Sequence, residues 1–475
     1  MVSVAQAIER LGALAAEPPL ARLAIAFRAA GHELALVGGP VRDAFLGRPI
    51  TDFDLTTDAR PERTLEIVGP LAATTWDVGR EFGTIGALVD GERVEITTYR
   101  ADAYDGATRK PVVAFGEDLD GDLRRRDFTV NAMALRLPDL VLVDPHGGLD
   151  DLLGGVLDTP SDPEVSFGDD PLRMMRAARF VAQLGFRVSD RVENAMSALA
   201  TTLEIVSAER IADELAKLLR AADPVDGVRL LVETGLADLV LPEVPALRLE
   251  TDEHAHHKDV YEHSLTVLRQ AIELENARDL PGAPDLVLRL AALLHDIGKP
   301  ATKRVEGRTV SFHHHDVVGA KLAAKRLRAL RFDNGTIASV SRLIELHLRF
   351  FGYSDQPWTD SAVRRYVRDA GEELQRLHIL TRADVTTRNR RKAERLEFAY
   401  DDLEARIAEI AAAEDLAAVR PDLDGGDIMR ILGLKPGPEV GAAYRFLLDL
   451  RLDEGALGPE EAERRLQAWW AARAG

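Results

Sequence analysis

The spacing of apolar residues changes along this chain, and that change constrains the fold more than any other feature. Short apolar runs broken by turn signals, such as 85–89, 94–98 and 140–143, occur within residues 34–145 and predict the strands of a small mixed α/β unit. From about residue 171 onward, apolar residues recur at helical spacing and strand signals almost vanish. The sequence therefore predicts an α+β protein in which an all-helical body follows a sheet-containing N-terminal part.

Length and turn signals divide the chain further. Its 475 residues exceed what one hydrophobic core normally serves, so two to four domains are expected. Turn-rich stretches at 161–163 and 168–171, and the prolines Pro242 and Pro245, predict boundaries. We therefore expect four parts, at residues 1–160, 161–245, 246–395 and 396–475.

A glycine pair and an Asp-x-Asp pattern lie in the first part, within VGGPVRDAFLGRPITDFDLT at 37–56. Gly38 and Gly39 end a strand-like run and precede a helix-like segment, so the backbone can approach an anion closely and its free N–H groups can face phosphate. Asp52 and Asp54 lie two residues apart, a spacing that places both carboxylates on one face of a strand. Two hard oxygen donors there suit Mg²⁺ that carries a nucleoside triphosphate.

Two more blocks follow, RRDFTVNAMAL at 125–135 and DDPLRMMRAARFVAQLGF from residue 169. In the second, Asp170 precedes Pro171, a pair that is typical of a helix start. Arg173, Arg176 and Arg179 then recur every third residue, which places them along one side of that helix over an arc of about 120°. The alternative for this row is a helix face that is salt-bridged to an acidic surface.

Composition limits the compartment and the partners. The absence of cysteine excludes disulfides and thiolate metal sites and fits a reducing cytoplasm, and no apolar run predicts a signal peptide or a membrane span. The net charge of −19 argues against a general nucleic-acid binder, so an RNA partner would need locally concentrated basic residues. One such segment, TRNRRKAER, contains Arg388, Arg390, Arg391, Lys392 and Arg395, and an RNA contact and a solvated helix face remain equal alternatives for it.

In their order, these blocks resemble the nucleotidyltransferases that build or extend RNA 3′ ends, especially the bacterial CCA-adding enzymes and poly(A) polymerases. The resemblance implies a nucleotidyltransferase head at 1–160 and a helical neck for base recognition at 161–245. It also implies that Asp52, Asp54 and, on a neighbouring strand, Glu95 hold Mg²⁺ and carry catalysis. The residues implied for nucleotide binding are Gly38, Gly39, Arg42, Arg126, Asp170, Arg173, Arg176 and Arg179, with Asp127 and Asn131 holding the sugar or bracing the loop.

The same resemblance assigns the reading of the incoming base to Asp170 and Arg173. A carboxylate accepts a hydrogen bond from the exocyclic amine of C or A, and a guanidinium donates to ring acceptors, whereas U and G present the opposite pattern at the amine position. Such a site can select C or A without a nucleic-acid template. Relatives usually carry Glu where this chain has Asp169, a conservative departure because Asp170 carries the role.

The third part contains histidines in the pattern of the HD phosphohydrolase superfamily. Residue by residue, the resemblance gives His263, His295, Asp296 and Asp384 as ligands of a divalent metal such as Mn²⁺, Ni²⁺ or Fe²⁺. His315 and His347 match extra ligands of some members. We expect His254, His256 and His257 to lie in an exposed loop instead. Some relatives with this domain are phosphohydrolases and in others the domain is a scaffold, so its activity stays open.

The whole order of blocks implies a cytoplasmic CCA tRNA nucleotidyltransferase that uses CTP and ATP and releases pyrophosphate, with no membrane partner. Residues 396–475 resemble the helical tail that receives tRNA, and Trp469 and Trp470 are expected to pack against other residues. The segment RADAYDGATRKP keeps Arg100, Asp102 and Tyr104, which favours an enzyme able to add the terminal A. The alternatives are an A-adding enzyme or poly(A) polymerase, and an HD metal phosphohydrolase whose head only binds RNA. The oligomeric state stays open.

Overall fold

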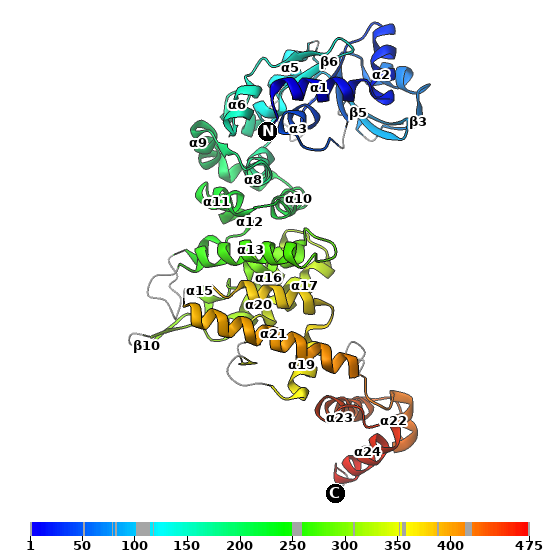
Figure 1. Ribbon diagram of the computed structural model, residues 1–475, viewed down its shortest axis with the longest axis vertical. Coiled ribbons are helices and arrows are strands. Elements are labelled where there is room, and N and C mark those ends of the chain that lie inside the picture. The colour runs from blue at the N-terminus through cyan, green and yellow to red at the C-terminus, as the bar shows by residue number, and fades with distance from the viewer. Residues whose placement is uncertain are drawn as a thin grey trace. The chain divides into compact units, whose positions relative to one another are not determined.

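Figure 1 shows the protein as a computed structural model with two compact units, Met1–Val240 and Leu241–Gly475, which we call unit 1 and unit 2. The structure describes residues 2–50, 53–77, 79–80, 83–100, 115–116, 118–248, 259–306, 309–350, 352–353, 358–386, 389–413 and 420–473. In this part of the chain, none of the helices is both long and apolar enough to cross a membrane.

Unit 1 contains a mixed seven-stranded sheet with the strand order β3-β4-β5-β2-β1-β6-β7. Its strands are β1 Leu34–Val37, β2 Phe53–Thr57, β3 Ala72–Trp76, β4 Thr84–Val89, β5 Glu92–Thr98, β6 Ala134–Leu137 and β7 Val141–Val143. β2 and β5 are parallel, whereas the other neighbouring pairs are antiparallel. The sheet confirms the mixed α/β part that the apolar runs predicted.

Helices before and between the strands complete the head. They are α1 Val4–Ala15, α2 Pro18–Ala29, α3 Gly39–Leu46, α4 Pro61–Val68 and α5 Leu119–Arg124. All four residues of β1 are buried, and Ala35 and Val37 pack in one apolar cluster with Leu119 and Leu123 of α5. This packing holds α5 beside the interior strand of the sheet, which matters for the site below.

The rest of unit 1 is helical apart from a two-stranded pairing of β8 Val156–Leu157 with β9 Arg187–Val188. Its helices are α6 Gly148–Gly154, α7 Pro163–Asp169, α8 Leu172–Leu184, α9 Asp190–Leu199, α10 Ala208–Leu219, α11 Val225–Glu233 and α12 Ala237–Val240. Phe180 of α8 meets Phe128 edge to face at a centroid distance of 5.8 Å, so α8 is packed against the RRDFT block.

Unit 2 is almost entirely helical. It comprises α13 Val260–Ala277, α14 Leu286–Leu294, α15 Lys299–Thr302, α16 His315–Ala329, α17 Asn334–Leu346, α19 Asp360–Ala370, α20 Leu374–Ala383, α21 Arg390–Ala413, α22 Gly425–Leu432, α23 Pro438–Glu454 and α24 Pro459–Arg473, with a hairpin of β10 Arg304–Glu306 and β11 Thr309–Ser311. The last three helices share their own apolar cluster, in which Trp469 stacks on Phe446 at 4.7 Å. The predicted α+β class and the helical body are confirmed.

Candidate functional site

The acidic face of the sheet is formed where β2 and β5 run side by side. The parallel register pairs Asp54 directly with Glu95, as the sequence led us to expect for the strand of Glu95. Neighbouring strands lie about 4.8 Å apart, and paired residues project from the same face, so the two carboxylates are neighbours. Asp52 lies outside the described residues.

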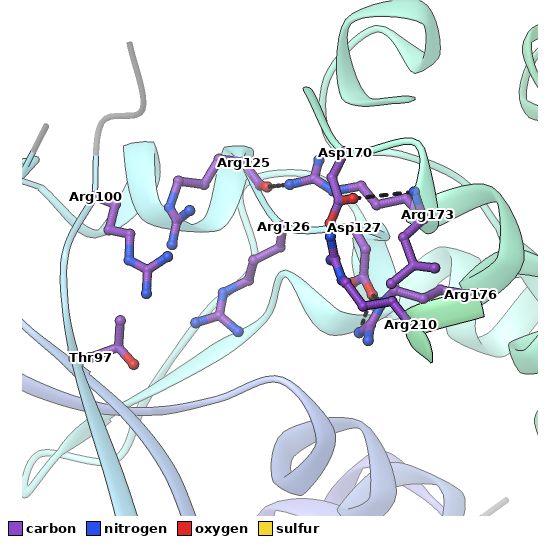
Figure 2. A pocket seen from close by; sticks show the side chains of 10 residues that line it. Thr97, Arg100, Arg125, Arg126, Asp127, Asp170, Arg173, Arg176 and Arg210 are labelled. Atoms are coloured by element: carbon purple, nitrogen blue, oxygen red, sulfur yellow. Dashed lines mark hydrogen bonds and ion pairs between the residues drawn. The ribbon is translucent and has the colours of Figure 1, made fainter. Parts of the chain in front are cut away.

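A cavity of about 340 Å³ adjoins this acidic face (Figure 2). Thr97 lines it and follows Glu95 by two residues on β5, hence on the same face of the strand. The other lining residues are Arg100, Arg125, Arg126, Asp127, Asp170, Leu172, Arg173, Arg176 and Arg210. Six arginines against two carboxylates make the lining strongly cationic, as a triphosphate requires.

One group of these arginines surrounds Asp122, a fully buried residue of α5. Arg126 Nη2 and Arg125 Nε donate to this carboxylate at 3.2 and 3.3 Å, and the backbone N–H of Arg100 donates at 3.4 Å. Burial raises the pKa of Asp122, but the charges of Arg126 and Arg125 outweigh it and leave the pKa below its ordinary value. Asp122 therefore stays ionised beside the cavity.

The glycine pair also has a local effect on Arg126. Gly38 follows β1 and has φ +72°, a conformation that favours glycine, and a Cβ there would lie 3.2 Å from Arg126 Nη1. The missing side chain thus makes room for Arg126 beside the backbone. Gly39 begins α3, whose Arg42 donates to Asn131 Oδ1 at 2.6 Å and to its neighbour Asp43 at 3.0 Å.

The second group of arginines lies around Asp170 in Figure 2. One carboxylate oxygen of Asp170 accepts from the backbone N–H of Leu172 at 3.2 Å, and the other accepts from Arg210 Nη2 at 3.1 Å. The predicted helix start is one residue early, since α8 begins at Leu172 with Pro171 as its N-cap. Arg173 donates to Ser166 Oγ and to the backbone carbonyl of Arg125, both at 2.7 Å. Asp170 and Arg173 both line the cavity.

The remaining two arginines of the row are bound to buried carboxylates. Arg176 donates to Asp127 Oδ2 from Nη2 and Nε at 2.6 and 2.8 Å, and Arg179 Nε lies 2.7 Å from Glu214 Oε2. Burial raises the pKa of Asp127, but Arg176 and a hydrogen bond from Asn131 hold it well below its usual range. Arg176 lines the cavity, whereas Arg179 is not among the lining residues, so the structure does not bring the whole row to one ligand.

Unit 2 gathers six histidine and aspartate side chains into a second site, which we call the His/Asp cluster. Its members are His263, His295, Asp296, His315, His347 and Asp384, which form two groups of three with ligand atoms within 4.8 Å of one another. His263 Nε2 lies 2.9 Å from Asp384 Oδ1, and His315 Nε2 lies 3.3 Å from Asp296 Oδ1. His254, His256 and His257 lie outside the described residues.

All four histidines of the His/Asp cluster present Nε2 to its centre. The Nδ1 atoms of three of them lie 2.9, 2.8 and 2.6 Å from the backbone carbonyls of Ala292, Phe312 and Ile344, and that of His263 lies 3.1 Å from Thr386 Oγ1. A carbonyl accepts only from a protonated nitrogen, so it leaves Nε2 with its lone pair in the neutral ring. This arrangement is typical of metal-ligating histidines.

Charge in the His/Asp cluster also favours a cation. Burial disfavours the ionised form of both Asp296 and Asp384. His295 and Lys299 nevertheless keep the pKa of Asp296 well below its ordinary value. His263 and His295 do the same for the pKa of Asp384. Burial lowers the pKa of His347 to about 4, so this ring is neutral near pH 7. Burial lowers the pKa of His295, but Asp296 and Asp384 outweigh it and raise the pKa to about 10, so a bound cation would take the place of this proton. Two buried carboxylates among imidazole nitrogens form a donor set that suits a divalent transition metal.

Comparison with known proteins shows the family of the chain. Family profiles for the poly(A) polymerase head domain, a probable RNA- and SrmB-binding site of polymerase A, and the HD domain match residues 34–158, 185–247 and 260–389. An A-adding tRNA nucleotidyltransferase of Deinococcus radiodurans is 36% identical over 92% of this chain and 95% of the relative. A CCA-adding enzyme of Streptococcus thermophilus is 31% identical over 92% of both chains. The chain belongs to the CCA-adding family of tRNA nucleotidyltransferases.

Solved structures of the family have the same fold as this tRNA nucleotidyltransferase. The crystal structure of the Bacillus stearothermophilus CCA-adding enzyme with CTP aligns with 96% of this chain and 99% of that chain, at a TM-score of 0.66 and 25% identity. The Thermotoga maritima CCA-adding enzyme, complexed with tRNA, aligns over 98% of both chains at a TM-score of 0.62 and 18% identity.

Several residues of the tRNA nucleotidyltransferase site were missed from the sequence. Arg125 stands next to Arg126 in the RRDFT block, so the block itself could have suggested it. Asp122 precedes that block and carries no pattern of its own. Arg210 and Glu214 belong to α10, some 40 residues from their partners, and only the packing of α10 on α8 reveals them.

Proposed function

We propose that this tRNA nucleotidyltransferase adds C, C and A in turn to the 3′ end of tRNA, from CTP and ATP, with release of pyrophosphate. The observation that carries the proposal is that Thr97, which lies on the same face of β5 as Glu95, lines the arginine-rich cavity, and that Glu95 pairs with Asp54. A triphosphate in the cavity would place its anionic oxygens among guanidinium groups and its reacting phosphorus toward the carboxylates. A head that only binds RNA has no need of this pairing.

Asp52, Asp54 and Glu95 would hold Mg²⁺. The donor set fits, because the paired positions of Asp54 and Glu95 offer two hard oxygen ligands on one exposed face. An ion held by these carboxylates would supply the positive charge that makes a 3′-hydroxyl more acidic and that offsets charge on pyrophosphate. Arg126 lines the cavity and would supply fixed positive charge from the protein side, because Asp122 holds its Nη2.

Asp170 and Arg173 would select the base. A carboxylate has about four lone-pair sites, so Asp170 can accept from the amine of C or A while it keeps its bonds to Leu172 and Arg210. Arg173 is fixed by Ser166 Oγ and by a backbone carbonyl, which orients its plane before the base arrives. We propose that Arg42, Arg176 and Arg179 brace this wall through Asn131, Asp127 and Glu214.

A tRNA end-addition assay tests the proposal. The substrates are tRNAs that lack one, two or three terminal nucleotides, each incubated with a single triphosphate and with CTP plus ATP. Two C additions followed by one A support the proposal, and a variant Asp54→Asn should add none. A second candidate is an A-adding enzyme, since a relative of that name matches 92% of the chain. Addition of A alone would favour this candidate. Long A tracts would indicate a poly(A) polymerase.

We also propose that the His/Asp cluster is a metal-dependent phosphohydrolase site. The inward Nε2 atoms, each fixed through Nδ1, favour it over a scaffold, since a scaffold needs no such orientation. Mn²⁺, Ni²⁺ or Fe²⁺ would activate water for attack on a phosphate ester. His263, His295 and Asp384 form one set of ligands, and Asp296 with His315 and His347 forms the other.

A matched pair of neighbouring variants tests this second activity. Wild-type protein loaded with each metal should retain it through gel filtration and hydrolyse nucleoside 2′,3′-cyclic phosphates or 3′-phosphates. His315→Gln should lose metal and hydrolysis, whereas His313→Gln, an exposed control two residues away, should keep both. Equal metal content in the two variants would contradict the proposal. We further propose a cytoplasmic location, which cell fractionation tests.

A further inference from the structure

We propose that Asp122 is a positioning residue for nucleotide addition, because it fixes the arginines that receive the triphosphate relative to the acidic strand. The inference rests on the proposed nucleotide addition and deepens it. Asp122 belongs to α5, ahead of the RRDFT block, and none of the sequence patterns singled it out. It touches neither nucleotide nor metal in this assignment and acts through its partners.

Four donors from three segments meet at this one carboxylate. Oδ2 accepts from Arg126 Nη2 at 3.2 Å and from Thr56 Oγ1 at 3.3 Å, whose single proton is shared with the backbone carbonyl of Thr97 at 3.0 Å. Oδ1 accepts from Arg125 Nε at 3.3 Å and from the backbone N–H of Arg100 at 3.4 Å. The three arginines line the cavity. The fourth donor, Thr56, lies on β2, two residues after Asp54 and therefore on the same face.

The geometry of Arg126 shows what this anchoring achieves. Its Nη2 is bound to Asp122, its Nη1 lies beside Gly38, and its Nε has no hydrogen-bond partner in the part of the chain that the structure describes. A buried donor without a partner is costly, so a ligand oxygen that fills this place gains strongly. Asp122 thus fixes the guanidinium through Nη2, while the hydrogen-bonding capacity of Nε stays unused.

Charge supports the same role. Arg125 and Arg126 repel each other, and their attraction to Asp122 is what keeps both guanidinium groups at one place before the triphosphate arrives. Preorganised charge of this kind costs no reorganisation when the substrate binds. A purely structural carboxylate would stabilise α5 but would not influence triphosphate affinity through Arg126.

Asp122→Asn tests the inference, with Asp120→Asn as the control. Asp120 lies on the same helix with 63% of its side chain exposed, and undergoes the same chemical change. We expect Asp122→Asn to raise KM for CTP and ATP by the same factor, about tenfold, and to raise the inhibition constant of pyrophosphate similarly, since a charge-assisted hydrogen bond is lost. The preference between CTP and ATP should not change, because Asp170 reads the base.

A double variant separates positioning from general damage. In an Arg126→Gln background, Asp122→Asn should add no further increase in KM if Asp122 acts through Arg126. Unchanged KM in Asp122→Asn, or full additivity with Arg126→Gln, would overturn the inference. If Asp122→Asn does not fold, Thr56→Val removes one donor without a change of charge and should raise KM about threefold; unchanged KM there would also overturn it. Wild-type protein that adds no nucleotide to any tRNA end would instead refute the proposed function.

Discussion

Replacing Asp127 by Asn should destabilise unit 1 by an amount that follows from its contacts. The carboxylate is 9% exposed, and it accepts from Arg176 at 2.6 and 2.8 Å, from Asn131 Nδ2 at 3.0 Å and from the N–H of Phe128 at 2.8 Å. Removing one partner of a buried ion pair costs about 3–5 kcal/mol. Arg176 keeps 35% of its side chain exposed and has a second carboxylate, Glu214, at 3.7 Å, so it would not be left fully unpaired. We therefore expect Asp127→Asn to lower the free energy of unfolding by about 2–3 kcal/mol.

Thermal unfolding measures this cost. A loss of 1 kcal/mol lowers Tm by about 2–4 °C in domains of this size, so Asp127→Asn should lower the Tm of unit 1 by about 4–12 °C. Asp120→Asn, which removes an exposed carboxylate, should leave Tm within about 2 °C. In a double-mutant cycle, Arg176→Gln should remove much of the effect of Asp127→Asn. A change below 2 °C, or strict additivity of the two variants, would refute the buried-pair reasoning.

Three other predictions follow from the geometry. Asp54→Asn, paired with Glu95 on the sheet, should lower the single-turnover rate of addition by about 10³-fold or more and leave tRNA affinity in gel-shift assays unchanged, and a rate near wild type would remove the metal role. Arg210→Gln removes the ion pair to one oxygen of Asp170 and should lower discrimination against UTP and GTP about fivefold, an effect of the size expected for a partly exposed ion pair. Equal misincorporation by the variant and the wild type would show that Arg210 does not orient the carboxylate. Burial lowers the pKa of His378 from 6.5 to about 4. As the pH drops below about 6.5, the unfolded chain therefore binds this proton before the folded chain does, and the free energy of unfolding falls. The expected loss is about 2 kcal/mol between pH 7.5 and pH 5. Urea unfolding should show a shallower pH dependence for His378→Gln, and identical curves would contradict the assignment.

Local patterns predicted those features that depend on near neighbours in the sequence. The two-residue spacing of a strand put the carboxylate of Asp54 on a definite face, and Asp170 before Pro171 marked the start of α8. Blocks of this kind specify geometry through a few backbone dihedrals, so they can be recognised without the fold. The three-residue spacing of Arg173, Arg176 and Arg179 was also real, but it could not show that only the first two line the cavity.

Partners from distant segments were beyond the reach of such patterns. A buried charge must find an opposite charge or a hydrogen bond wherever the fold supplies one, and sequence distance does not enter that requirement. Glu214 therefore pairs with Arg179, and Arg210 pairs with Asp170, only because α10 packs on α8. In unit 2, the sequence predicted the residues of the His/Asp cluster. It did not predict the backbone carbonyls that accept from Nδ1 of three of the histidines and thereby orient their Nε2 atoms toward the centre of the cluster.

The sequence by itself determined the order of the parts, the strand and helix periods, and the kinds of donor available at each site, because these depend on covalent neighbours. The tertiary structure alone decided which charged groups meet. Asp122 shows the reason most clearly, since its four donors come from segments that only the folded sheet and α5 bring within hydrogen-bond distance of one carboxylate.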